Sequence, residues 1–136
     1  MSLKVLDILV VDDQPGVRYL LDIIIKELGH RVHTAQNGLE ALEKVCSIQP
    51  DLVFMDVRMP VMGGLEALAR LKIQSPQTKV IIMSAYGSGD IINEARKLGA
   101  TACLAKPFDV EEIKEFLQKY ILKHYTDQHI YKASVI

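Results

Sequence analysis

Four short apolar runs in the sequence end in side chains that can take part in chemistry. The candidates are Asp12 and Asp13 after 8–11, Asp56 after 52–55, Ser84 after 80–83, and Lys106 after 102–105. Apolar runs of this length are typical of strands that are buried on both faces of a parallel sheet. Because the carboxyl ends of parallel strands meet at one edge, we expect three carboxylates, a hydroxyl and an amine to converge there.

The converging residues predict a site for a divalent cation and for phosphate chemistry. Two like unit charges about 4 Å apart repel by about 4 kcal/mol at an effective dielectric near 20, so three carboxylates favour a bound cation. Oxygen ligands of this kind suit Mg²⁺, which would balance two carboxylates while Lys106 balances the third. A carboxylate beside such a Lewis acid can attack phosphorus, and Ser84 and Lys106 can bind the phosphoryl oxygens. A single strand-end aspartate is usually a helix cap or a solvated loop residue, but candidates at four strand ends favour one shared site.

Stretches with strand and helix character alternate along the chain. Strand-like runs lie at 6–11, 31–35, 52–56, 79–83 and 102–105, and each is followed by a helical pattern. A βα unit repeated five times predicts an α/β fold, with a five-stranded parallel sheet, helices on both faces and right-handed crossovers. In the first helix, Ile23 and Ile25 broaden the apolar stripe, which is compatible either with a partner site or with a well-buried helix.

The composition and charge indicate one globular domain. The chain has 136 residues, of which 49% are hydrophobic and 24% charged, a balance that supports a folded core. The formal net charge of −1 gives no general attraction to nucleic acid or membranes, and no apolar run is long enough to span a bilayer. No signal-peptide pattern opens the sequence, so we expect a cytoplasmic protein with Cys46 and Cys103 as buried free thiols. We expect a domain at 1–123 and a tail at 124–136 that is too short for a second domain.

The strand-end residues and their neighbours resemble the receiver domain of bacterial response regulators. The resemblance spans 6–121 and rests on Asp12-Asp13, Asp56, Ser84-Ala85 and Lys106-Pro107-Phe108. It implies the flavodoxin-like strand order 2-1-3-4-5, with the site where the order reverses, and a cis peptide before Pro107. It also implies a signalling domain rather than a conventional enzyme, one that assists its own phosphorylation and dephosphorylation.

The resemblance also implies a role for each candidate residue. Asp56 would be the phosphoacceptor, Ser84 and Lys106 would bind the phosphoryl group, and Asp12, Asp13, Asp56 and the backbone carbonyl of Arg58 would hold Mg²⁺. The implied phosphoryl donor is a phosphohistidine on a sensor histidine kinase or a histidine phosphotransfer protein. We expect no direct binding of nucleic acid, no membrane association, and a monomer or weak dimer.

The amino-acid sequences of these motifs are similar to those of single-domain receivers that act as phosphorelay intermediates in sporulating bacteria. In that subgroup the first helix and neighbouring loops dock a four-helix histidine phosphotransferase. The apolar side chains of Leu21, Ile24 and Ile25 are compatible with such a docking face. Two positions depart from the usual receiver pattern. Cys103 replaces an aromatic or histidine switch residue, and Gly63 replaces a frequent aspartate, which predicts a looser loop after the phosphoacceptor.

Three other functions remain as alternatives. A phosphatase of the haloacid dehalogenase type would need an aspartate two residues after the nucleophile, where this chain has Arg58. A flavin-binding module would need a phosphate-binding loop after the first strand, where Asp12 and Asp13 would repel a phosphate. A receiver cut from a longer DNA-binding regulator stays open, although no basic recognition helix is visible after Ile121.

Overall fold

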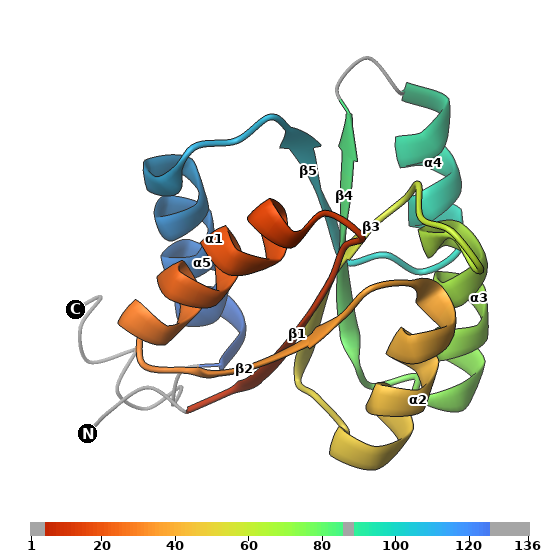
Figure 1. Cartoon of the computed structure of the whole chain (residues 1–136), viewed down its shortest axis with the longest axis horizontal. Coiled ribbons are helices and arrows are strands. Elements are labelled where there is room, and N and C mark those ends of the chain that lie inside the picture. Colours follow the sequence, from red (N-terminus) through yellow and green to blue (C-terminus); the bar gives the residue numbers. More distant parts are fainter. Residues whose placement is uncertain (1–4, 86–88, 126–136) are drawn as a thin grey trace.

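The sheet has five parallel strands in the order β2-β1-β3-β4-β5, as predicted (Figure 1). The structure is a computed structural model that describes residues 5–85 and 89–125, so most of the tail expected at 124–136 lies outside the described residues. The strands are β1 (Asp7–Val11), β2 (Arg31–Ala35), β3 (Leu52–Asp56), β4 (Lys79–Ala85) and β5 (Ala102–Lys106). Strands β4 and β5 run past their predicted ends, so Ser84 and Lys106 belong to the strands themselves.

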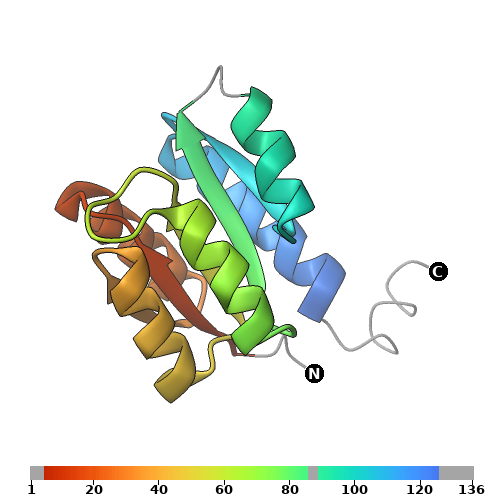
Figure 2. The same ribbon diagram turned by 90° about the vertical axis from the view of Figure 1, so that its right-hand side faces the viewer.

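The helices cover both faces of the sheet, with α1 and α5 on one face and α2, α3 and α4 on the other (Figures 1 and 2). They are α1 (Pro15–Glu27), α2 (Gly38–Ile48), α3 (Gly64–Gln74), α4 (Gly89–Lys97) and α5 (Val110–Tyr125). Pro15 begins α1, where its missing N–H leaves no hydrogen bond unmade. A capping box precedes α5, since the Glu112 N–H donates to Asp109 Oδ1 (2.8 Å) and the Asp109 N–H to Glu112 Oε1 (3.2 Å). Among the described residues, no helix has the length and apolar character needed to cross a membrane.

Two apolar cores lie on opposite faces of the sheet, because side chains alternate along each strand. On β3, Val53 and Met55 pack toward α2 and α3, whereas Phe54 packs toward α1 and α5, and all three are fully buried. Truncating a side chain such as Phe54 to alanine typically costs about 3–5 kcal/mol of stability. Strands β1 and β3 are therefore held firmly, and so are the carboxylates at their ends.

The burial of side chains decides between the two interpretations of the first helix and shows that one prediction, the burial of Cys46, is wrong. Leu21, Ile24 and Ile25 are at most 1% exposed and pack in the core between α1 and the sheet, so they form no docking face. Cys46 is exposed rather than buried, because helical spacing turns Val45 of α2 toward the core and the next residue toward solvent. Cys103 is half-buried, and both cysteines are free thiols.

Candidate functional site

The acidic cluster lies at the carboxyl ends of β1 and β3, where the strand order reverses. One carboxylate oxygen from each of Asp12, Asp13 and Asp56 lies within 4.8 Å of the other two. Parallel pairing of β1 with β3 aligns Val11 with Met55, so the residues that follow them emerge at the same edge of the sheet. Asp12 is fully buried and Asp13 is exposed, so the cluster opens to solvent on the side of Asp13.

Among the described residues, Lys106 is the cation whose side chain contacts carboxylates of this cluster. Its ammonium lies 2.7 Å from Asp12 Oδ2 and 3.1 Å from Asp56 Oδ1. Burial lowers the pKa of Lys106, but its hydrogen bonds to Asp12 and Asp56 outweigh that effect and hold the pKa above its ordinary value. Burial also raises the pKa of Asp56, and the hydrogen bond from Lys106 opposes this only in part. One ammonium thus pairs with two of the three carboxylates, which leaves the cluster with an excess of negative charge.

Ser84 and Arg58 complete the set of predicted site residues. Both line a pocket of about 480 Å³ together with Asp13, Asp56 and Lys106. The Ser84 hydroxyl donates to the carbonyl oxygen of Ala85 at 3.2 Å, so it must rotate before it can bind a ligand over Asp56. The structure therefore brings together all six residues singled out from the sequence.

The loop after Asp56 is fixed by close contacts of the main chain. A Cβ on Gly64 would lie 2.1 Å from the Asp56 carbonyl oxygen, so only glycine fits there. The Gly64 N–H donates to the Val57 carbonyl (2.8 Å), and the Gly38 N–H donates to the Met62 carbonyl (2.9 Å). These bonds tie the loop to the starts of α2 and α3, despite the glycine at position 63. The need for glycine at position 64 was not predicted from the sequence. The only sign of it there is the Gly63-Gly64 pair.

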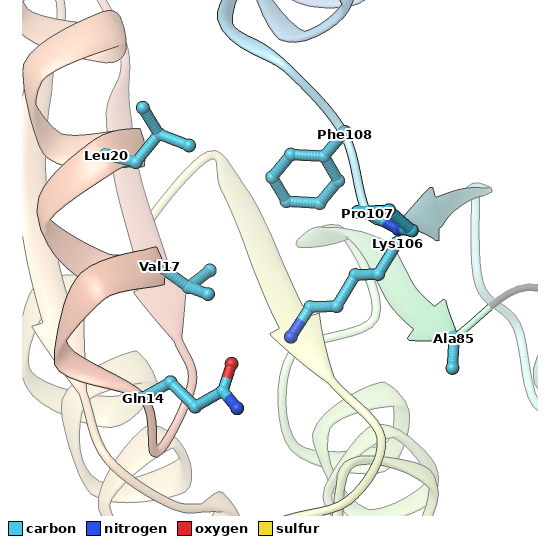
Figure 3. Close-up of a pocket in the computed structure, with 7 residues that line it drawn as sticks. All are labelled: Gln14, Val17, Leu20, Ala85, Lys106, Pro107 and Phe108. Carbon is cyan, nitrogen blue, oxygen red and sulfur yellow. The ribbon is translucent and has the colours of Figure 1, made fainter.

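An apolar groove of about 450 Å³ adjoins the acidic cluster. Figure 3 shows Val17 and Leu20 of α1 facing Phe108 and Pro107 across the groove, with the Lys106 side chain extending along its floor toward the end of β3. Gln14 and Ala85 complete the lining, and Lys106 also lines the pocket above Asp56. The peptide between Lys106 and Pro107 is cis, as predicted. The groove was missed in the sequence, where Phe108 was noted only as part of the motif after Lys106.

Comparison with known proteins identifies the family of the whole domain. The family model for the response regulator receiver domain matches residues 8–118. The chain belongs to this family. Receiver domains are signalling domains, which agrees with the prediction that the chain is not a conventional enzyme. The phosphatase and flavin-binding alternatives are thereby set aside.

Curated relatives include both single-domain proteins and longer regulators. Sporulation initiation phosphotransferase F of Bacillus subtilis is 46% identical over 114 residues, which cover 84% of this chain and 92% of the relative. Chemotaxis protein CheY of Listeria monocytogenes is 40% identical, with 84% and 97% covered. Regulatory protein AtoC of Escherichia coli is 39% identical, and the match spans 24% of its length. Among solved structures, the chemotaxis response regulator CheY4 of Vibrio cholerae superposes with a TM-score of 0.80 at 32% identity, covering 85% of this chain and 98% of CheY4.

Proposed function

We propose that the chain accepts a phosphoryl group on Asp56 from a phosphohistidine of a partner protein, in a reaction that depends on Mg²⁺. The observation that supports this most strongly is the contact of Asp56 with Lys106 inside a cluster of three carboxylates. A carboxylate oxygen of Asp56 attacks phosphorus, and the bond between phosphorus and the imidazole nitrogen breaks. The electron pair of that bond stays on the nitrogen of the partner's histidine.

The donor set fits Mg²⁺ as the resident cation. Carboxylate oxygens are the ligands that this hard ion prefers, and a divalent cation balances the negative charge that Lys106 leaves over. Asp12, Asp13, Asp56 and the carbonyl of Arg58 would hold it, with Asp12 acting largely through water. When bound, Mg²⁺ supplies positive charge beside the oxygens that become more negative during phosphoryl transfer.

Lys106 and Ser84 can stabilise the negative charge that phosphorylation adds. An acyl phosphate near −2 replaces a carboxylate of −1, so the site gains about one negative charge. The Lys106 ammonium is already within 3.1 Å of Asp56 and can follow the phosphoryl oxygens. Ser84 rotates away from the Ala85 carbonyl to donate its hydroxyl to the phosphoryl group, which changes the hydrogen bonding at the end of β4.

The apolar groove between α1 and the segment after β5 is the proposed docking surface for the histidine-bearing partner. It replaces the face at Leu21, Ile24 and Ile25, which is buried. The groove is continuous with the reaction site, because Gln14, Ala85 and Lys106 line both pockets. A helix of a histidine phosphotransfer protein that lays apolar side chains into this groove would bring its phosphohistidine toward Asp56.

Within a signalling system, we place the chain as a single-domain phosphorelay intermediate in the cytoplasm. The coverage of nearly the whole length of sporulation initiation phosphotransferase F supports this role. Cys103 supports it too, because a small half-buried side chain gives the outer face of α4 and β5 little bulk to move. The matches to receivers within longer regulators such as AtoC favour the second candidate, a receiver that controls an attached output domain.

The test is phosphorylation by acetyl phosphate, followed by intact mass. The full chain should become phosphorylated when Mg²⁺ is present and should stay unmodified after chelation. Asp56→Asn should not react, whereas Asp22→Asn, which changes a partly exposed carboxylate that pairs with Lys26 on α1, should react like the wild type. Phosphorylation of the Asp56→Asn variant would show that the nucleophile is a different residue.

A relay role has its own test. The phosphorylated chain is mixed with histidine phosphotransfer proteins, and the movement of labelled phosphate to a second histidine is followed over time. A relay intermediate should pass phosphate on within the lifetime of its own phosphorylated form. If the chain keeps its phosphate with every such partner, and phosphorylation causes a large conformational change at α4, a receiver that controls an attached output domain would be favoured.

A further inference from the structure

Arg18 contacts the acidic cluster through the main chain of Asp12. It lies in the first turn of α1, and its Nη1 donates to the Asp12 carbonyl oxygen at 2.6 Å. The other polar atoms of Asp12 are also bonded: its N–H donates to the Ala35 carbonyl (3.1 Å), Oδ1 accepts from the Gln14 N–H (2.9 Å) and Oδ2 accepts from Lys106 (2.7 Å). Asp12 is therefore the most tightly held residue of the three aspartates, and Arg18 supplies the only bond to its carbonyl among those found in the described residues.

The stability of helix α1 does not explain an arginine at this position. A cation near a helix N-terminus is opposed by the positive end of the helix dipole. Helix α1 has no acidic residue in its first turn, and Gln14 makes no side-chain capping bond that would offset this cost. The guanidinium instead reaches back past the start of the helix to the end of β1. Among the described residues, the bond to the Asp12 carbonyl is the only hydrogen bond found for this guanidinium.

The hydrogen bond from Arg18 to the Asp12 carbonyl and the bond from Lys106 to the Asp12 carboxylate should differ in how they change when the site is phosphorylated. In the proposed function, Lys106 follows the phosphoryl group and so loosens its hold on the Asp12 carboxylate. The Arg18 bond goes to a backbone carbonyl, whose charge does not change when the site binds a cation or becomes phosphorylated. It can hold the turn from β1 into α1 in every state of the site, and this turn carries both Asp12 and Asp13.

We propose that Arg18 is a positioning residue for the cation site, one that fixes the main chain of Asp12 so that Asp12 and Asp13 keep their geometry relative to Asp56. This inference rests on the proposed use of the cluster for Mg²⁺. The competing possibility is that Arg18 acts only through its charge. The two predict opposite signs, because loss of a nearby positive charge alone would tighten the binding of Mg²⁺, whereas loss of the backbone bond would weaken it.

The test is isothermal titration of the unphosphorylated full chain with Mg²⁺. Arg18→Met keeps an unbranched stem but removes both the charge and the N–H donors, and it should raise the Kd about tenfold, as losses of supporting bonds around metal ligands do. Arg18→Lys keeps the charge and one possible donor, and it should recover part of the affinity. Lys26→Met removes a charge from the exposed last turn of the same helix and should leave the Kd unchanged. An unchanged or lower Kd in Arg18→Met would overturn the inference.

A second measurement needs no metal. The Gln14 amide, which donates to Asp12 Oδ1, should exchange its hydrogen faster in Arg18→Met than in the wild type at equal global stability. Unchanged exchange would also overturn the inference. Asp13→Ala separates this proposal from the proposed function. If Asp13→Ala binds Mg²⁺ normally, the proposed assignment of the cation site is wrong. If Asp13→Ala loses Mg²⁺ while Arg18→Met keeps it, only the role of Arg18 is wrong.

Discussion

The carboxylates at the two ends of the sheet differ in their ion pairs and in the direction of their pKa shifts. At the amino end, Arg31 Nε and Nη2 donate to the two oxygens of Asp7 at 2.8 and 2.9 Å, and His33 Nε2 lies 3.1 Å from the same carboxylate. The hydrogen bonds from Arg31 and His33 hold the pKa of Asp7 far below its usual range. At the carboxyl end, burial raises the pKa of Asp56, and one lysine pairs with two of the three carboxylates.

The difference separates ion pairs that stabilise the fold from charges that are arranged for binding. Asp7 has two partners of its own, so the charge at the amino end is balanced within the chain. The carboxyl end keeps an excess of negative charge beside the point where β1 and β3 diverge, which is where open α/β sheets bind ligands. A cation should therefore change the stability and chemistry of one end and leave the other unaffected.

Removing a carboxylate from the carboxyl end should have the largest effect. We expect Asp13→Ala to abolish phosphorylation by acetyl phosphate while the far-ultraviolet circular dichroism stays unchanged. Mg²⁺ at ten times its Kd should raise the unfolding free energy of the wild type by about 1.4 kcal/mol, and this gain should vanish in Asp13→Ala. Asp7→Asn is the matched control at the amino end and should keep the gain, although its own stability falls. Equal loss of the gain in both variants would break the comparison.

The next largest effect should come from the apolar groove. Val17→Asp places a charge where apolar contacts are expected, and we expect transfer from a phosphorylated histidine partner to slow by about tenfold or more. Phosphorylation by acetyl phosphate should be unaffected, because the residues around Asp56 are unchanged. Ile23→Asp, on the exposed part of the same helix, is the control and should transfer normally. Slow transfer in Ile23→Asp alone would move the docking surface to the outer side of α1.

The difference between the ends also explains what the sequence could predict. The residues at the strand ends were predictable, because the alternation of strands and helices requires parallel strands whose carboxyl ends share an edge. The groove was not, since it forms between α1 and Phe108, which are far apart in the sequence. Periodicity identifies the apolar stripe of α1 but does not tell which members contact the sheet. Leu21 and Ile24 do, so the aspartate substitutions that we would have chosen there from the sequence would disrupt the core instead of a docking face.

A smaller effect concerns acid stability and His30 at the amino end. The side chain is 7% exposed, and its Nδ1 accepts a hydrogen bond from the Leu6 N–H at 3.0 Å. Burial lowers the pKa of His30 below 6.5, so the unfolded chain binds the proton more readily than the folded chain. The unfolding free energy should fall as the pH drops below about 6.5 and should level off once it passes the lowered pKa.

Urea unfolding at a series of pH values measures this dependence. His30→Asn offers an acceptor oxygen near the position of Nδ1 without a titrating ring, and it should flatten the curve in this range. Asp56→Asn should retain the fall, because it changes only the carboxyl end. A fall that persists unchanged in His30→Asn would contradict the assignment of the acid sensitivity to His30.

The smallest effect should follow from removing the residues after Lys123. Helix α5 follows the carboxyl end of β5 and runs back toward the amino end of the sheet, so the truncation lies at the end of the sheet opposite the carboxyl end of β3 (Figure 1). Among the α5 side chains whose burial is described, the last ones in the core are Tyr120 and Ile121, and both are retained. We expect phosphorylation by acetyl phosphate and transfer to a histidine partner at wild-type rates, with little change in the melting temperature. A clear fall in the melting temperature with normal phosphorylation would mean that 124–136 packs against the amino end. A change in phosphorylation would mean that the two ends are coupled through α5, against the separation on which the other predictions depend.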